Sequence, residues 1–256
     1  MNDFKKEVAK RIKLNPKKVK LVKSVKNFLL SSTEAKYSYN YLALGRPIIQ
    51  YPQDMIAVQE IIWKVKPDLI IETGIAHGGS LIMSAFMLSL LDICEAIELG
   101  KKISPKNSSR KVLGIDIDIR KHNYKEIKKH PMSSRIQMIQ GSSIDSEIVK
   151  KVKKIVKKHK RVLVLLDSNH THDHVLKELE AYAPFVSKGS YCVVFDTIIE
   201  DLPKNIFQDR NWGPGDNPKT AVYEYLKNCN DFKIDKTIQD KLLITVAPDG
   251  YLKKIS

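Results

Sequence analysis

The feature of this sequence that most constrains its fold is the regular alternation of short apolar segments with longer amphipathic ones. Helical patterns lie between the apolar segments, and a further one at residues 52–67 precedes the first. The apolar segments occupy residues 68–72, 111–117, 135–141, 161–167 and 190–196. Strands that are apolar at nearly every position are typical of a sheet buried on both faces. The alternation therefore predicts an α/β fold, in which a mostly parallel twisted sheet carries helices on both faces.

The C-terminal segment departs from this alternation. After a long polar loop and a helical pattern at residues 220–228, the sequence continues with FKIDK, LLITVAP and YLKKI. We expect short strands here rather than another helix, and we expect them to pair antiparallel at one edge of the sheet. At 256 residues, one large domain is the leading expectation. The expected division is a basic N-terminal arm or lid at residues 1–50 and a catalytic domain at residues 51–256.

Basic residues are concentrated in two segments. The formal net charge is +15, but residues 1–30 carry ten Lys or Arg and two acids, and residues 150–161 carry eight Lys or Arg and no acid. The rest of the chain is close to neutral, and aromatic residues do not alternate with the lysines, which argues against a specific nucleic-acid-binding protein. Solvated helix faces are the simplest interpretation. Contact between the arm and an anionic membrane surface is the alternative.

The sequence favours a cytoplasmic protein. The N-terminus has the charge of a signal peptide but lacks its continuous apolar core, and no apolar run approaches the ~20 residues of a membrane span. The cysteines form no CxxC pair and no even-numbered framework; they are Cys94, Cys192 and Cys229. A reducing compartment fits this cysteine usage.

Small and acidic residues stand at the carboxyl ends of the five expected strands, where open parallel sheets bind their ligands. One acid at a strand end often only caps a helix, whereas acids at four of five ends favour a binding site. In chain order the strand ends carry Glu72, Asp116, the run Gly141-Ser142-Ser143, Asp167 and Asp196.

The turn after the first strand contains Gly74, Gly78 and Gly79 and leads directly into a helix. Glycine lets the backbone approach a ligand closely, and the helix N-terminus offers free N–H groups. The G-x-x-x-G-G spacing is neither the dinucleotide-binding G-x-G-x-x-G pattern nor a P-loop, so a nucleoside triphosphate site is unsupported. His77, within the turn, is expected to form a wall on the cofactor side.

A carboxylate at the end of the second strand can accept hydrogen bonds from both ribose hydroxyls of a nucleoside. Asp116 is the candidate, with Asp118 as the alternative. Ser142 or Ser143, after the third strand, would then lie near the base.

Asp167 and Asp196 are the candidates for a metal site. Neighbouring strands lie about 4.8 Å apart, so carboxylates at two adjacent strand ends can reach one Mg2+ ion, which prefers oxygen ligands. The competing interpretation is that Asp167 caps a helix and Asp196 binds a loop amide. His170 is the candidate general base, because the unperturbed pKa of histidine lies near neutrality. His172 and His174 are expected at a helix start, and the run contains no iron facial triad.

Several of these segments together resemble one known family. ETGIAHGGS, GIDID, QGSSID, LLDSNHTHDHVL, VVFD and WGPGDNPKTAV occur in this order within residues 40–250. They are similar to the cephalosporin hydroxylase family, which includes the cephamycin C-7 methoxylation protein and rhamnosyl O-methyltransferases. The resemblance implies a Rossmann-like class I methyltransferase fold and S-adenosylmethionine as cofactor.

The resemblance also implies roles for individual residues. Asp116 would bind the ribose and Ser143 would lie near the adenine, while Asp167 and Asp196 would hold Mg2+. The cephamycin-type protein has a Glu-Asp pair where this chain has Phe195-Asp196, so one carboxylate is missing here. The residues that would face the methionine part of the cofactor, or lie beside it, are Glu72, Gly74, Gly78, Gly79, Ser80 and Asp167.

The leading hypothesis is a metal-assisted O-methyltransferase acting on a small molecule, or on a sugar or glycolipid hydroxyl, and forming a homo-oligomer. Catalysis would consist mainly of aligning the acceptor oxygen with the sulfonium methyl group. A cephalosporin-type hydroxylase is the enzymatic alternative, and a non-catalytic binding module that uses the basic arm is the other.

Overall fold

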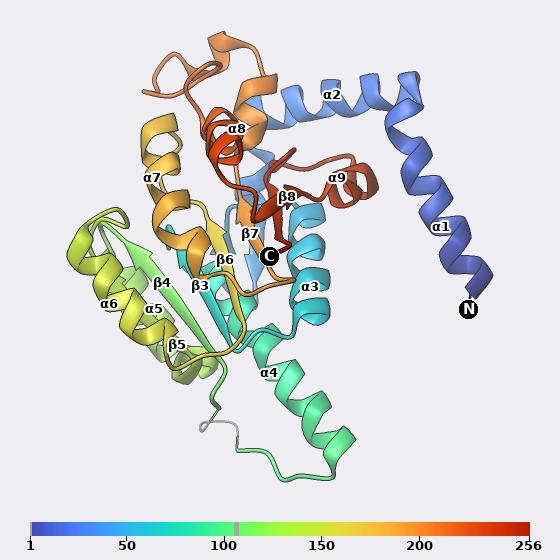
Figure 1. Ribbon diagram of the computed structural model, residues 1–256. Coiled ribbons are helices and arrows are strands. Elements are labelled where there is room, and N and C mark those ends of the chain that lie inside the picture. Colours follow the sequence, from blue (N-terminus) through green and yellow to red (C-terminus); the bar gives the residue numbers. More distant parts are fainter. Residues whose placement is uncertain (1, 105–107) are drawn as a thin grey trace.

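The computed structural model, which describes residues 2–104 and 108–256, places the five apolar segments as parallel strands of one seven-stranded sheet (Figure 1). Across the sheet, the order is β5 (Ile136–Gln140), β4 (Lys111–Asp116), β3 (Leu69–Thr73), β6 (Val162–Leu166), β7 (Tyr191–Val194), β9 (Tyr251–Lys254) and β8 (Phe232–Ile234). β9 runs antiparallel to both of its neighbours. The predicted α/β class and the antiparallel edge are therefore confirmed.

Helices cover both faces of the sheet because alternate strand residues point to opposite sides. In β3, Ile70 belongs to the core under one face, while Leu69 and Ile71 belong to the core under the other. The first face is covered by α3 (Pro52–Val65), α4 (Gly79–Leu99) and α5 (Lys121–Lys129). The second face is covered by α6 (Ser146–Val156), α7 (His172–Tyr182) and α8 (Pro218–Asn228).

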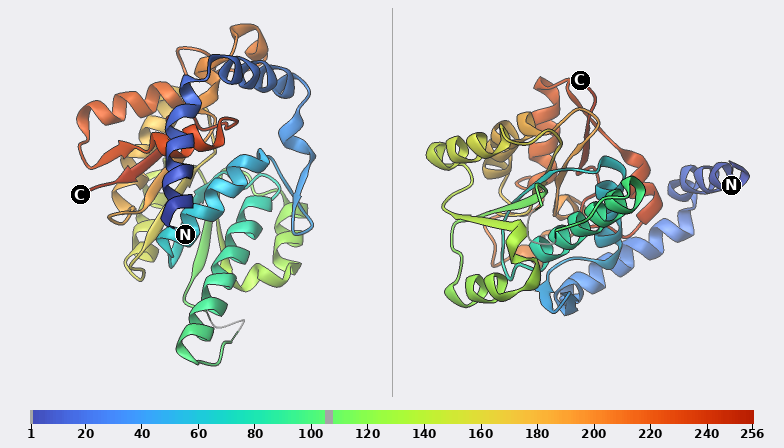
Figure 2. Two further views of the ribbon diagram at one scale, coloured as in Figure 1. Left: turned by 90° about the vertical axis from the view of Figure 1, so that its right-hand side faces the viewer. Right: turned by 90° about the horizontal axis from the view of Figure 1, so that it is seen from below.

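The N-terminal arm consists of two helices and a hairpin. In Figure 1, helix α2 (Val19–Glu34) runs across the top of the molecule and helix α1 (Asn2–Leu14) projects at the right. In the left view of Figure 2, α1 lies in front of the body, and Asn15, which follows α1, donates a hydrogen bond to the carbonyl oxygen of Asp240 at 3.0 Å. The end of α2 is anchored, because Leu29 and Ser32 are buried. The antiparallel strands β1 (Tyr41–Ala43) and β2 (Arg46–Ile48) follow. Positive φ angles at both loop residues between them, 49° and 86°, suit a tight two-residue hairpin turn.

The expectation of strands and no helix near the C-terminus is partly wrong. Residues 236–242 form α9 (Lys236–Leu242), and the LLITVAP segment forms no strand. Asp235 caps α9, since its side chain accepts a hydrogen bond from Thr237 N. The apolar LLITVAP segment is held by side-chain contacts to α3: Asp54 accepts hydrogen bonds from Val246 N and from Thr245 Oγ1.

Helix α4 is the long apolar helix that the sequence predicts after the glycine turn. By length and composition alone it would pass as a membrane span, which contradicts the expectation that no apolar run reaches that length. Its N-terminal two-thirds instead packs against the sheet, and Gly100, with φ of 61°, ends it. The buried residues of this helix are Gly79, Leu81, Ile82, Ser84, Ala85, Leu88 and Leu91.

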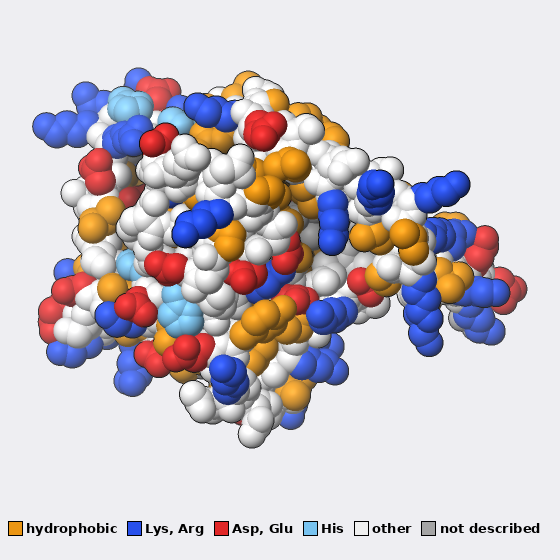
Figure 3. Space-filling view, turned by 90° about the horizontal axis from the view of Figure 1, so that it is seen from above, with side chains coloured by type: hydrophobic (Ala, Val, Ile, Leu, Met, Phe, Trp, Pro, Cys, Tyr) orange, Lys and Arg blue, Asp and Glu red, His pale blue; other side chains and the backbone are white. Residues whose placement is uncertain are grey.

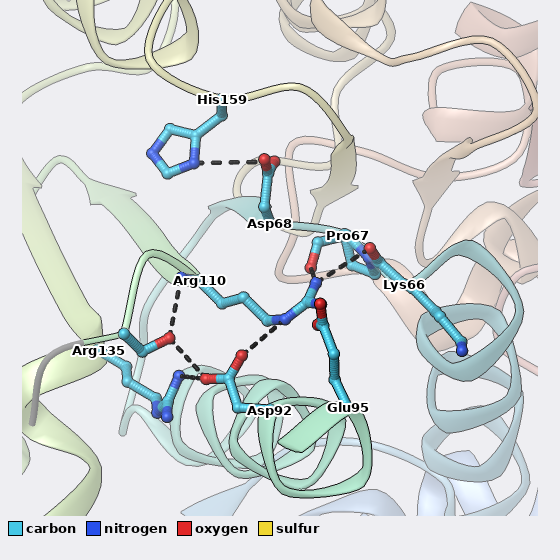
Figure 4. Close-up of polar contacts among 9 residues, drawn as sticks. Lys66, Pro67, Asp68, Asp92, Glu95, Arg110, Arg135 and His159 are labelled. Carbon is cyan, nitrogen blue, oxygen red and sulfur yellow. Dashed lines mark hydrogen bonds and ion pairs between the residues drawn. The ribbon is translucent and has the colours of Figure 1, made fainter. Parts of the chain in front are cut away.

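A charged network ties α4 to the amino ends of the central strands (Figure 4). Asp92 accepts hydrogen bonds from Arg110 Nε at 2.8 Å and from Arg135 at 2.5 Å. Arg110 also donates to the carbonyl oxygen of Pro67 at 2.9 Å. The Arg135 side chain is only 3% exposed, so its pairing satisfies a charge that would otherwise be buried alone. This network fixes the amino ends of β3, β4 and β5. The ligand site is predicted at the other end of these strands, where their carboxyl ends lie.

Candidate functional site

Two aspartates and a histidine meet at the carboxyl ends of β6 and β7. Asp167 follows β6 and Asp196 follows β7, and these strands are hydrogen-bonded neighbours. His170 Nε2 lies 3.2 Å from Asp196 Oδ2. One ligand atom from each of the three side chains lies within 4.8 Å of the others. The structure thus brings together the two acids and the histidine that the sequence singled out.

The charges around Asp167 fit a bound cation. Burial raises the pKa of the Asp167 carboxyl well above its ordinary value, and the nearby carboxylates of Asp196 and Glu72 raise it further. In residues 2–104 and 108–256, neither Lys nor Arg forms an ion pair with any of these three acids. Carboxylate oxygens are the ligands that Mg2+ prefers. Phe195, which stands where the family resemblance implies an acid, is buried and apolar, so this donor set is small.

Glu200 and Asp201 lie close in sequence to Asp196 but serve a structural role. The Glu200 carboxylate accepts hydrogen bonds from Gly215 N, at 2.8 Å, and from the Asn217 side chain. Asp201 pairs with the buried Lys219. Both acids therefore fix the loop before α8 rather than complete the metal site.

The other two histidines of the run also make structural contacts. His172 Nδ1 lies 2.8 Å from Thr220 Oγ1, which joins the start of α7 to α8. His174 Nε2 lies 3.1 Å from the hydroxyl of Ser143 and 3.5 Å from a carboxylate oxygen of the buried Glu178. Only His170 lies beside the two metal-site acids.

The glycine turn after β3 leaves no room for side chains. A Cβ at Gly74, where φ is 87°, would overlap the carbonyl group of Asp167 and lie 3.0 Å from Ser168 Cα. A Cβ at Gly78, where φ is 84°, would overlap the side chain of Ile127. The turn that begins at Gly74 and the end of β6 are therefore in backbone contact, which places the glycine turn directly beside Asp167.

Asp116 points toward the glycine turn, not toward bulk solvent. Its Oδ2 accepts hydrogen bonds from Ile75 N at 2.7 Å and from Ala76 N at 3.3 Å. Its Oδ1 accepts one from Asp118 N at 3.0 Å. Asp118 itself is exposed. The glycine turn and the acid that the sequence assigned to the ribose therefore lie in contact, with lone pairs of the carboxylate left for a ligand.

Glu72 and Ser80 form a buried pair at the start of α4. The Ser80 hydroxyl donates a hydrogen bond to Glu72 Oε1. Glu72 is only 2% exposed, and this burial raises the pKa of its carboxyl to about 8. Without a cationic partner, this carboxyl is therefore largely protonated at neutral pH.

The remaining predicted residues occupy the edges of the site. Ser143 is buried and its hydroxyl contacts His174, while Ser142 is half-buried in the turn after β5. The carbonyl oxygen of His77 accepts two hydrogen bonds from the Arg46 guanidinium, at 2.7 and 3.1 Å. The arm thus contacts the glycine turn directly.

Sequence reasoning missed two residues of the site. Gln50 Nε2 donates a hydrogen bond to Asp167 Oδ2 at 3.0 Å, and Asp54 lies in the same buried region. Both come from outside the strand ends, and no motif marked them. Trp212, from the loop before α8, packs edge-on against His170 with ring centroids 5.1 Å apart.

Comparison with known proteins identifies relatives over most of the chain. The sequence model of the family described as Rhamnosyl O-methyltransferase/CmcI matches residues 35–255. A rhamnosyl O-methyltransferase of Mycobacterium bovis is 29% identical over 204 residues, which are 78% of this chain and 72% of that protein. A rhamnosyl O-methyltransferase of Mycobacterium leprae is 25% identical over 211 residues, covering 82% of this chain and 81% of that protein.

Solved structures show the same fold. An apo structure of CmcI is similar with a TM-score of 0.53 at 17% identity, covering 85% of this chain and 77% of that chain. A structure of CmcI with Mg and SAM has the same TM-score and identity, and covers 85% and 78%. The predicted Rossmann-like methyltransferase fold is therefore confirmed.

Proposed function

The chain belongs to the rhamnosyl O-methyltransferase/CmcI family and is an S-adenosylmethionine-dependent O-methyltransferase, and from this premise we propose that its acceptor is a hydroxyl group of a saccharide or of another small molecule. The observation that carries the proposal is the position of the acidic cluster. Asp167, His170 and Asp196 lie beside a glycine turn that Asp116 contacts. An acceptor oxygen bound at the cluster would lie next to a cofactor bound at the turn.

The side chains of the cluster suit different tasks. Asp167 and Asp196 would hold Mg2+, because they supply the oxygen atoms that this ion prefers. When bound, Mg2+ supplies Lewis acidity, which lowers the pKa of an alcohol and makes it a better nucleophile. His170 supplies nitrogen, which suits Mg2+ less well, so we assign it the role of accepting the acceptor's proton. Asp196, whose Oδ2 lies 3.2 Å from His170 Nε2, orients the imidazole ring.

The loop before α8 forms the wall of the acceptor side. Trp212 contacts His170, and the guanidinium of Arg210 lies 5.2 Å from the centre of the indole ring. A flat aromatic surface beside polar groups suits a sugar ring, whose C–H faces pack on aromatics while its hydroxyls form hydrogen bonds. The relatives named rhamnosyl O-methyltransferases support a deoxyhexose as the first acceptor to test.

The direct test of the function combines binding with turnover. We expect calorimetry to show one equivalent of S-adenosylhomocysteine bound to the purified protein. We also expect formation of S-adenosylhomocysteine from S-adenosylmethionine when methyl α-rhamnoside and Mg2+ are added, with a large decrease on adding EDTA. Absence of cofactor binding to well-folded protein would overturn the cofactor assignment. Binding without turnover on any tested sugar would overturn the saccharide acceptor alone.

We further propose that the basic arm contacts anionic membranes, as an enzyme acting on a glycolipid would require. Lys and Arg side chains crowd the projecting arm at the right of Figure 3. Apolar side chains are exposed among them, with Phe4 64% and Val19 80% exposed. Basic and apolar groups on one segment favour binding to anionic lipid headgroups and the adjacent acyl boundary.

We propose that the protein is cytoplasmic, because its cysteine usage fits a reducing compartment, and that it forms a homo-oligomer. Ile97 and Leu99 are 76% and 55% exposed at the projecting end of α4, which supports a contact between copies there. Light scattering coupled to size-exclusion chromatography tests this assembly, and a monomeric mass at high concentration would contradict it.

A further inference from the structure

A groove separates helix α1 from the edge of the sheet that β8 and β9 form. Its volume is about 900 Å3, and the left view of Figure 2 shows α1 in front of these C-terminal strands. The hydrogen bond from Asn15 to the carbonyl oxygen of Asp240 fixes one end of the helix against the body. The groove contains none of the residues assigned above to methyl transfer.

The arm side of the groove is apolar. Phe4, Val8 and Ile12 follow one another at intervals of four residues, so they lie on one face of α1, and all three line the groove. Phe4 is 64% exposed, while Val8 and Ile12 are half-buried. The body therefore covers this apolar stripe only in part, and the open remainder suits an aliphatic chain.

The sheet side of the groove is basic. Lys233 of β8 lies directly opposite Lys253 of β9, which is also paired with Tyr191 of β7. Paired residues share a face of the sheet, and Tyr191 belongs to the core of the first face, so both lysines point to that face. Lys64, near the end of α3, donates a hydrogen bond to the Tyr191 hydroxyl at 3.3 Å. Three lysines from separate elements therefore meet on one side of the groove.

Acids of the chain do not neutralise these three lysines. Asp235 and Asp240 also line the groove, but within residues 2–104 and 108–256 no carboxylate forms an ion pair with Lys64, Lys233 or Lys253. Like charges directly opposite each other on neighbouring strands destabilise a sheet. An anion bound between Lys233 and Lys253 would remove this repulsion.

We propose that the groove binds one molecule of anionic phospholipid, with its phosphate on Lys64, Lys233 and Lys253 and an acyl chain along the apolar stripe of α1. The lysines call for an anion and the stripe calls for an apolar chain, and an anionic phospholipid carries both. The inference deepens the membrane contact proposed above and rests on that contact for the source of the lipid.

The groove lies apart from the methyl-transfer site. Its lysines are next to Tyr191, the first residue of β7, whereas the metal-site acid Asp196 follows the other end of this strand. The bound phospholipid is therefore an anchor for the enzyme and not the methyl acceptor.

The test uses a phospholipid that is monomeric in solution, so that adsorption to vesicles does not contribute. We expect calorimetry on the full chain to show one equivalent of dihexanoyl phosphatidylglycerol bound, below the concentration at which this lipid forms micelles. Dihexanoyl phosphatidylcholine has the same chains but no net charge, and it should bind at least about 10-fold more weakly. Glycerol phosphate, which has the anion without the chains, should also bind at least about 10-fold more weakly.

A pair of lysine substitutions tests the anion site. Lys233→Gln combined with Lys253→Gln should raise the dissociation constant of phosphatidylglycerol about 10-fold or more, since each basic residue contributes roughly fivefold. This variant should be at least as stable as wild type without lipid, because it removes the like-charged pair. The matched control is Lys151→Gln with Lys154→Gln, which removes the same charge from the exposed face of α6 and should change the constant less than about twofold.

A substitution in α1 tests the apolar stripe. Val8→Asn should raise the dissociation constant of phosphatidylglycerol about threefold or more, because it removes apolar contact with the chain. Val19→Asn is the control, since Val19 is an exposed arm residue that does not line the groove, and it should leave the constant unchanged.

The outcomes separate the groove from a general attraction of the arm to membranes. Vesicle binding without saturable binding of monomeric phosphatidylglycerol would overturn the groove site and leave the proposed membrane contact standing. Equal affinity for the two phospholipids, or equal effects of the groove and control lysine variants, would also overturn it. Tighter binding of hexaglutamate than of phosphatidylglycerol would show that the groove takes an acidic peptide instead.

Discussion

Glu72 shows how one buried carboxyl makes the stability of the protein depend on pH. Its side chain lies under the start of α4, where burial raises the pKa to about 8 from an ordinary value of 4.5. The folded state therefore binds this proton more tightly than the unfolded chain does. The stabilising contribution is complete below the ordinary pKa and is lost as pH rises through the folded pKa.

We predict that Glu72→Gln makes the cofactor-free protein more stable relative to wild type as the pH rises. Gln cannot ionise, so the variant does not lose this stabilisation. In wild type, the free energy of unfolding should fall by on the order of 3 kcal/mol between pH 5 and pH 8, because one pKa unit corresponds to about 1.4 kcal/mol. Urea denaturation of both proteins at the two pH values measures the difference. Parallel stability curves for the two proteins would contradict the assignment of this titration to Glu72.

Asp196 combines a special backbone conformation with a metal-site side chain. Its φ is 55°, a left-handed conformation that Asn tolerates well. Asp196→Asn should therefore retain the fold and S-adenosylhomocysteine binding while weakening the response of methyl transfer to Mg2+ by about 10-fold or more, as loss of a ligand to the metal implies. Titration of activity with Mg2+ measures this effect. An unchanged Mg2+ response would remove Asp196 from the metal site.

Residues at strand ends could be predicted from the sequence because the sheet itself brings them together. Asp116, Asp167 and Asp196 follow apolar strands, and parallel pairing places such ends along one edge. Gln50 could not be predicted in this way, since it reaches the site from a separate hairpin. Its role depends on tertiary packing that no local pattern encodes.

At the scale of elements, the contact between β2 and α4 connects the arm to the cofactor site. We predict that Gly79→Ala destabilises the protein by about 2 kcal/mol, because the added methyl group would overlap Pro47 O and force the hairpin away. Helix propensity alone would predict the opposite sign, since Ala favours helices over Gly. The dissociation constant of S-adenosylhomocysteine should rise as well, measured by calorimetry.

Gly213→Ala is the matched control for this substitution. Gly213 also lacks a left-handed φ, and a Cβ there would meet its nearest neighbour at 3.7 Å, an ordinary contact. Its unfolding free energy should change by no more than about 0.5 kcal/mol. A stabilised Gly79→Ala protein would show that the hairpin does not press on α4.

Elements with strong periodicity were predicted correctly, whereas α9 was not. Helices α3 and α4 and the five parallel strands have long apolar patterns that tertiary contacts reinforce. Helix α9 was missed because it has only 7 residues, and its local signal is the cap at Asp235 rather than a periodic pattern. The LLITVAP segment has the composition of a strand but is held by hydrogen bonds to Asp54 instead.

For the molecule as a whole, the arm divides into an anchored part and a projecting part. None of residues 3–18 is buried, whereas Leu29 and Ser32 are buried on the body. Removal of residues 1–18 should therefore leave the fold and the affinity for S-adenosylhomocysteine unchanged. We expect the charge distribution of the whole chain, rather than any single residue, to determine whether the protein binds anionic membranes.

We predict that the protein lacking residues 1–18 loses most of its binding to vesicles of anionic phospholipid. Each basic residue near such a surface contributes roughly 1 kcal/mol, so binding should fall by more than about 10-fold. Co-sedimentation at low and high salt measures this, with neutral phosphatidylcholine vesicles as the control. Equal sedimentation of the full and shortened proteins would contradict the membrane role of the arm.

The position of β9 has a consequence for biosynthesis. This strand lies between β7 and β8, so the sheet edge at β7 stays open until residues 251–254 have left the ribosome. A nascent chain stalled earlier would expose the apolar backbone edge of β7, a template for association with other chains. We therefore expect nascent chains of this protein that are arrested before residue 251 to require chaperone protection.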